Sequence, residues 1–281
     1  MPSGILNIDK PAGVSSAAVV NRVKKITGFP CGHMGTLDPL ASGVLPVGVG
    51  NASRLFDYLL KKEKVYRAVF LFGAESDTLD STGEISFGAG PVPSEQAILS
   101  ALPALTGEIL QEPPLYSAKS VNGMRAYDLA RRGIPFTLEK KKVIIYSLSL
   151  TGFKGEGKYE FSVRCGGGTY IRSIARDLAA ALGTKAIMVS LVREQSGAFS
   201  LAEALSPETL TLENWQSYLV PPEKAVDFPV ASFTGIMAKR LADGLSQPFE
   251  GKGLYRLWLN GSFYGIAEAG NGTIKTKTKL C

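Results

Sequence analysis

The chain is short of the side chains that most metal and hydrolytic sites need. Its 281 residues include one histidine, His33, and three cysteines. A zinc site built on two or three histidines is therefore excluded, as is a serine-histidine-aspartate triad unless His33 is its base. The cysteines Cys31, Cys165 and Cys281 are odd in number and far apart, so reduced thiols are expected rather than disulfides. We expect no metal site.

Long apolar runs are also missing. No stretch approaches the roughly 18 apolar residues of a membrane-spanning helix, and residues 1–11 lack the basic start and apolar core of a secretory signal. We expect a cytoplasmic protein with no membrane partner. A hydrophobic content of 45% supports one large domain and one small one, and the net charge of +6 favours a polyanionic partner without proving it.

The sequence contains no complete motif for a nucleotide-binding or calcium-binding loop. The run Gly166 to Gly168 could cradle phosphate at a helix start, but no Lys-Ser/Thr pair follows it. Gly48-Val49-Gly50 lacks the third glycine of a dinucleotide fingerprint. The acidic segment 75–83 does not have the spacing of an EF-hand and is better interpreted as a hairpin loop. No cofactor is expected.

Bend-forming and reactive residues are densest in segment 32–54, GHMGTLDPLASGVLPVGVGNASR. Gly32 and Gly35 are expected to adopt left-handed angles, and Pro39 disfavours helical angles at Asp38. Asp38 should therefore project from a turn. An Asp-Pro pair by itself is just as typical of an ordinary turn.

Periodicity predicts a mixed succession of strands and helices. From Gly43 an apolar run predicts a buried strand, in which Pro46 favours an edge position or a bulge. Other strands are expected over 4–9, 64–73, 141–150 and 158–165, and helices from Ser15 or Ser16 to Thr27, from Ser53 to Leu60, over 94–105 and from the glycine run to Leu182.

The residues from Gly32 to Pro46 resemble the signature of the TruB family of pseudouridine synthases. The resemblance implies that Asp38 is the catalytic carboxylate. His33, inside the same motif, would contact RNA in the space that an extruded base leaves. Lys10 and Pro11 resemble the family's first motif and make Lys10 a candidate RNA ligand; alone, Lys10 would be a solvated turn lysine.

Three further motifs carry the resemblance. Tyr66, in a Lys-x-Tyr-Arg strand, would lie against the target base, and Arg172, in Gly-Thr-Tyr-Ile-Arg, would pair with the catalytic aspartate. Tyr170 could supply a second ring and hydroxyl near the base. A looser match begins at Leu191, a candidate substrate contact.

Segment 113–142 combines aromatic and basic residues, as a surface that stacks on and neutralises RNA does. In TruB-like proteins this region clamps the RNA stem; otherwise it is a solvated helix with a charged end. Residues 230–281 contain an Asn260-Gly261 hairpin signal and alternating lysines at 275, 277 and 279. They resemble a PUA-type RNA-binding domain, with a structural end-cap as the alternative.

The resemblance implies a mixed α/β catalytic domain (residues 1–229) on a largely antiparallel sheet, followed by a small β-rich PUA-like domain (residues 230–281). The implied function is a monomeric tRNA pseudouridine synthase that modifies uridine 55 of the T-arm without cofactor or guide RNA. The carboxylate could attack C1′, remove the C2′ proton or add at C6. A non-enzymatic RNA-binding protein and a guide-RNA-dependent synthase remain alternatives.

Overall fold

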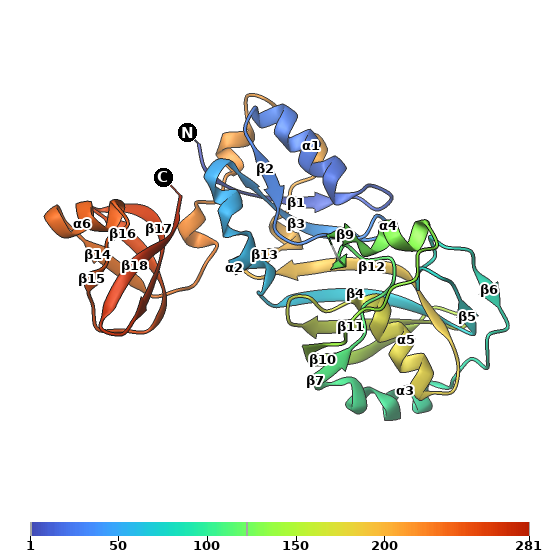
Figure 1. Ribbon diagram of the computed structural model, residues 1–281. Coiled ribbons are helices and arrows are strands. Elements are labelled where there is room, and N and C mark those ends of the chain that lie inside the picture. The colour runs from blue at the N-terminus through green and yellow to red at the C-terminus, as the bar shows by residue number, and fades with distance from the viewer. Residues whose placement is uncertain (1, 122, 281) are drawn as a thin grey trace. The chain divides into compact units, whose positions relative to one another are not determined.

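The computed structural model describes residues 2–121 and 123–280 (Figure 1). Asn122, within the expected clamp, and Cys281 lie outside the described residues. The chain forms two compact units. Unit 1 contains the chain up to Asp38, then Val44–Leu60 and the chain from Ser196 onward; unit 2 contains Pro39–Gly43 and Lys61–Gln195.

A sheet with the strand order β12-β4-β11-β10-β7 forms the centre of unit 2. The pairs β4/β11, β10/β11 and β7/β10 are antiparallel, and β12 pairs in parallel with the first residues of β3. The prediction of a largely antiparallel sheet is confirmed. The strands are β4 Lys64–Phe72, β7 Gly107–Gln111, β10 Lys141–Phe153, β11 Lys158–Cys165 and β12 Ala186–Ser196.

Strand β4 has the predicted alternation of faces. Lys64, Tyr66, Ala68 and Phe70 are buried, whereas Arg67 between them is exposed. Phe70 stacks on Phe161 of β11 with ring centroids 4.8 Å apart. The period of two therefore places Tyr66 on the packed face of the sheet.

Helices α3 (Glu95–Ala101) and α5 (Ile171–Ala181) contact each other, α3 against β10 and α5 against β4. The expected hairpin is formed by β5 (Ala74–Glu75) and β6 (Ser86–Phe87) around residues 76–85. The remaining elements of unit 2 are the 3-10 helix η2 Leu102–Leu105, strands β8 Ser120–Val121 and β9 Met124–Arg125, and helix α4 Ala126–Arg131.

Unit 1 begins with β1 (Gly4–Lys10) and α1 (Ser16–Thr27). The Oγ of Ser15 accepts a hydrogen bond from the Ala18 N–H, and Gly28 ends the helix in a left-handed conformation at φ 73°. Strand β2 (Cys31–His33) pairs antiparallel with β3 (Ser42–Val49). The helix predicted from the serine pair is confirmed at both ends.

Three local predictions in this region were wrong. Gly32 has no left-handed angle because it lies in β2, opposite Gly48; Gly35 does have positive φ, 127°. Strand β3 is bonded to both β1 and β2, so the edge position expected from Pro46 is wrong, whereas the alternative of a bulge stays a prediction. The Pro46 carbonyl accepts a hydrogen bond from Met34 N–H. Ser53 does not cap a helix: its Oγ donates to Gly50 O inside the 3-10 helix η1 (Gly50–Leu55), which precedes α2 (Phe56–Leu60).

The C-terminal part of unit 1 is a five-stranded sheet in the order β14-β16-β17-β18-β15. Asn260 and Gly261 have φ of 50° and 80°, as a type I′ hairpin turn between β16 and β17 requires. The lysines of β18 alternate on its exposed face, as predicted. The elements are β14 Val230–Phe233, α6 Gly235–Ala242, β15 Gln247–Pro248, β16 Gly253–Leu259, β17 Ser262–Gly270 and β18 Thr273–Lys279.

This sheet shares a core with the segment that follows β3. Ile266 and Leu280 pack in one cluster with Leu55 and Leu59. The domain boundary expected near residue 230 stays a prediction. Short elements connect the two parts: β13 Phe199–Ser200 and the 3-10 helices η3 Leu201–Glu203, η4 Pro207–Thr209, η5 Trp215–Tyr218 and η6 Pro222–Lys224. Among the described residues, no helix is long and apolar enough to span a membrane.

Candidate active site

Asp38 lies in the connection between β2 and β3, directly before a turn at Pro39 and Leu40. Asp38 is partly exposed, whereas the preceding Leu37 is 3% exposed. The loop therefore has a buried anchor beside a partly exposed aspartate. The expectation that Asp38 is presented from a turn agrees with this geometry, and its catalytic role stays a prediction.

The buried anchor is held by a serine of helix α1. Ser16 Oγ donates to Leu37 O over 2.8 Å and accepts from Leu37 N over 2.9 Å. Ser16 itself is 3% exposed. Two segments 21 positions apart in the chain are thus joined by one hydroxyl immediately before Asp38.

Lys10 and His33 are the other candidates of unit 1. Lys10 is fully buried, and its Nζ donates to Pro11 O at 2.8 Å and to Val14 O at 2.6 Å. The alternative of a solvated turn lysine is therefore wrong, because these bonds tie the ammonium to its own loop. His33 is half-buried at the end of β2, opposite Val47. RNA contacts by either residue remain predictions.

Tyr66 and Leu191 lie in unit 2, on β4 and β12, and each is 6% exposed. Lys64 shares the buried face of β4 with Tyr66. Burial, together with the positive charge of Arg193, lowers the pKa of Lys64 to about 8. Burial raises the pKa of the Cys165 thiol, opposite Lys64 in the strand pairing, to about 11. The Cys165 thiol is therefore protonated at neutral pH.

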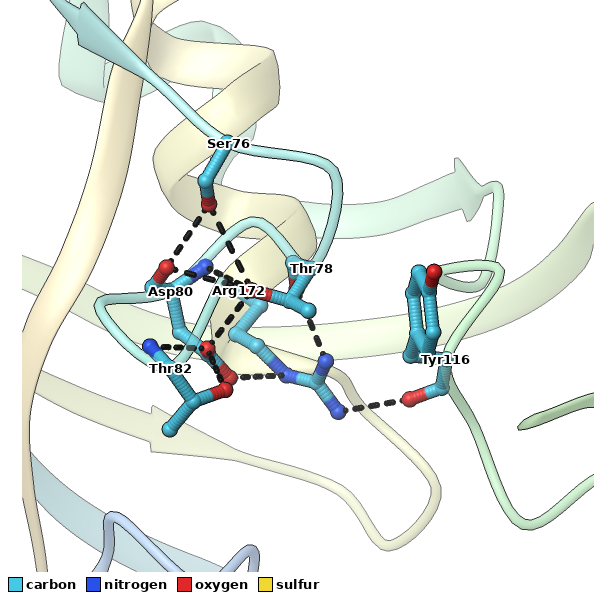
Figure 2. A network of polar contacts seen from close by, with 6 residues as sticks. All are labelled: Ser76, Thr78, Asp80, Thr82, Tyr116 and Arg172. Atoms are coloured by element: carbon cyan, nitrogen blue, oxygen red, sulfur yellow. Dashed lines mark hydrogen bonds and ion pairs between the residues drawn. The ribbon is translucent and has the colours of Figure 1, made fainter. Parts of the chain in front are cut away.

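Arg172 is 5% exposed at the start of α5, and its guanidinium is surrounded by oxygen atoms (Figure 2). Nη1 donates to Thr78 O at 2.9 Å and Nη2 to Tyr116 O at 3.0 Å. Nε lies 3.6 Å from Asp80 Oδ2, and both side chains of this ion pair are about 95% buried, with exposed fractions of 5% and 4%. The fork of the guanidinium is thereby held in one orientation.

Asp80, the ion-pair partner of Arg172, is a residue that the sequence interpretation did not single out. Its Oδ1 accepts from Thr78 Oγ1 at 2.8 Å, from Thr82 N at 2.9 Å and from Thr82 Oγ1 at 2.5 Å (Figure 2). Leu79, the residue before it, has a positive φ of 61°. The alternation of threonines around an aspartate was the available signal, because such a pattern can satisfy a buried carboxylate.

Tyr170 precedes Arg172 and is the N-cap of α5. The side-chain amide of Gln111 forms two bonds with its backbone: Tyr170 N donates to Gln111 Oε1 at 2.8 Å, and Gln111 Nε2 donates to Tyr170 O at 3.1 Å. Gln111 is 1% exposed at the end of β7. Gln111 was also missed by the sequence interpretation, because nothing local marks a glutamine as the partner of a helix 59 positions away.

Glycine is required where β3 starts. Gly43 has a φ of 100° and pairs with Arg193 of β12. A Cβ atom there would lie 2.3 Å from Arg193 O and 2.9 Å from Arg193 N. The close approach of the two backbones therefore excludes any side chain five residues after Asp38.

Comparison with known proteins defines the class. The TruB family pseudouridylate synthase N-terminal domain matches residues 22–171, a range that contains Asp38 and Tyr66 and ends just before Arg172. The tRNA pseudouridine synthase B of Clostridium kluyveri is 38% identical over 94% of this chain and 94% of its own. That of Caulobacter vibrioides is 40% identical over 86% of this chain and 80% of its own.

Among solved structures, a chain of a Cbf5-Nop10-Gar1 complex is similar, with a TM-score of 0.76 and 25% identity over 99% of this chain and 85% of that one. The mixed α/β fold is thus that of a pseudouridine synthase. The chain belongs to the TruB family of these enzymes.

Proposed function

We propose that this protein is a stand-alone tRNA pseudouridine synthase that isomerises uridine 55 in the T-arm of tRNA. The observation that carries the proposal is the partly exposed Asp38 beside a buried, clamped backbone, in a chain of the TruB family. Relatives that match over nearly the whole chain are named for tRNA. The reaction breaks the N1–C1′ bond and joins C1′ to C5, so it involves no change of redox state.

Asp38 is the proposed reactive group. An ionised carboxylate can attack C1′ to form a glycosyl ester, remove the C2′ proton or add to C6 of the base. In the proposal, Arg172 pairs with this carboxylate and favours its charged form. The bonds of Arg172 to Thr78 O and Tyr116 O support this role, because they orient the guanidinium before substrate arrives.

The target uridine must leave its base stack to reach a carboxylate of this kind, at a cost of about a few kcal/mol. In the proposal, Tyr66 and Tyr170 contact the flipped base, and Leu191 makes an apolar contact with it. His33 and Lys10 contact other parts of the RNA. Segment 113–142 supplies the clamp. Its helix α4 places Arg131 over the ring of Tyr127, with the cation 5.8 Å from the ring centroid, as an aromatic and basic surface for RNA.

Substitution of Asp38 by Asn tests the proposal. The amide preserves the size of the side chain but is neither a nucleophile nor a base, so release of tritium from C5-labelled uridine in unmodified tRNA should fall at least about a thousandfold. Affinity for tRNA should stay within a few-fold. Asp57→Asn, at an exposed position of α2, is the matched control and should react like the wild type.

The same assay separates the alternatives. Tight tRNA binding by the wild-type protein without tritium release would favour a non-enzymatic RNA-binding protein or a synthase that needs a guide RNA. The stand-alone enzyme is favoured because the relatives named tRNA pseudouridine synthase B are 37% to 41% identical, whereas a chain of an H/ACA RNP is 23% identical. The cytoplasmic location and monomeric state stay predictions.

A further inference from the structure

Ser16 forms a contact with Leu37, next to Asp38, and has no role among the groups proposed above to react or to bind RNA. The hydroxyl group has one donor hydrogen and can accept as well. Ser16 Oγ uses both capacities on a single residue, donating to Leu37 O at 2.8 Å and accepting from Leu37 N at 2.9 Å. Leu37 lies outside any strand, so the serine hydroxyl, and not a neighbouring strand, pairs the N–H and C=O groups of the Leu37 backbone.

The contact fixes the peptide that leads into Asp38. A peptide group is planar, so Leu37 C=O shares its plane with the N and Cα atoms of Asp38. Pro39 restricts Asp38 from the other side, by disfavouring helical angles at the residue before it. The Asp38 backbone is thus restrained by Ser16 on its N-terminal side and by proline on its C-terminal side.

Ser16 is itself attached to a rigid element. It is the first residue of α1, whose N-terminus is capped by Ser15 and whose C-terminus is closed by Gly28. The adjacent residues Ser15 and Ser16 therefore form different contacts. The exposed Ser15 completes the helix by accepting from Ala18 N at 3.1 Å, whereas the buried Ser16 reaches the Asp38 loop.

We infer that Ser16 is a positioning residue for catalysis, which aims the Asp38 carboxylate through its paired hydrogen bonds with Leu37. The inference rests on the proposed role of Asp38. Positioning of reacting groups is sensitive to small displacements, and a shift of about 1 Å can reduce a rate about a hundredfold. Loss of the hydroxyl should therefore affect the chemical step far more than it affects RNA affinity.

The test compares Ser16→Ala with Ser15→Ala. Single-turnover tritium release from C5-labelled unmodified tRNA, at saturating enzyme, should be about 10- to 100-fold slower in S16A. The dissociation constant for tRNA should stay within a few-fold. S15A loses a helix cap, so its thermal midpoint should fall while its single-turnover rate stays within about twofold of the wild type.

Hydrogen exchange provides a direct structural readout. The Leu37 amide should lose protection in S16A and keep it in S15A, since Ser16, and not Ser15, accepts that N–H. If S16A does not fold, Ser16→Cys replaces it: the thiol is similar in volume but a weak hydrogen-bond donor, and the same rate loss is expected.

A wild-type single-turnover rate in folded S16A or S16C would overturn the inference, as would equal rate losses in S15A and S16A. Asp38→Asn tells this failure apart from failure of the proposed function. An inactive D38N with a fully active S16A removes only the role of Ser16. An active D38N removes the role of Asp38, and with it the reason to position this loop.

Discussion

The two segments that carry the proposed reactive groups are held in different ways. Leu37, beside Asp38, is tied by a neutral hydroxyl, whereas Arg172 is tied by a carboxylate and two carbonyl oxygens. A neutral hydrogen bond carries a small desolvation cost. A buried ion pair carries a large one that only a complete set of partners offsets. Loss of a partner should therefore mainly change the orientation of Asp38 in the first case and lower the stability of the protein in the second.

Asp80→Asn should break the buried ion pair with Arg172 and have the largest effect on stability. The amide retains an acceptor for Thr78 and Thr82 but removes the negative charge facing a 5% exposed guanidinium. We expect a loss of about 3 to 5 kcal/mol in the free energy of unfolding, measured by urea titration. Glu75→Gln, exposed on the same hairpin, is the control and should change it by less than about 0.5 kcal/mol.

Gly43→Ala tests the backbone approach behind the Asp38 loop. The new Cβ would meet Arg193 O at 2.3 Å, and the residue would also keep a φ of 100°. We expect destabilisation of about 2 to 4 kcal/mol. Gly13→Ala is the matched control, because its φ is 81° but nothing lies within 4 Å of its Cβ. It should cost about 1 kcal/mol, and equal losses in the two variants would contradict the steric explanation.

Gln111→Met removes two neutral hydrogen bonds at the start of α5, the helix that also carries the charged Arg172. Methionine has a similar length but leaves Tyr170 N–H and C=O without the glutamine amide. The free energy of unfolding should fall by about 1 to 3 kcal/mol. The tritium-release rate should fall as well, because the start of α5 carries Arg172. A variant with normal stability and a normal rate would show that the hydrogen bonds between Gln111 and Tyr170 are not needed for the reaction.

Lys64 is expected to have an effect that is visible only as a pH dependence of stability. Its pKa is about 8 in the folded protein, because burial disfavours the charge, and about 10.5 in the unfolded chain. Between these values the unfolded state binds more protons, so stability should rise as the pH rises. The free-energy difference between wild type and Lys64→Met should shift in favour of the wild type by up to about 3 kcal/mol from pH 8 to 10.5. A flat difference would contradict the lowered pKa.

Local chemistry made much of the fold predictable. The serine pair and Gly28 bound helix α1, the period of two placed Tyr66 on a buried face, and Asn260-Gly261 formed the expected turn. In each case the preference is carried by residues within a few positions of one another. Local reasoning was wrong where a partner strand decided the outcome, as at Gly32 in β2 and Pro46 in β3.

The candidates Asp38, Tyr66 and Arg172 could be identified from the sequence, because motif residues carry the resemblance to the family wherever they lie in space. The residues that hold them in place became visible in the folded chain. Ser16 binds Leu37 and Asp80 binds Arg172 across 21 and 92 positions of chain, and Gln111 binds Tyr170 across 59. Such pairs form where packing removes polar groups from water and each must find a partner nearby, whatever its distance along the chain.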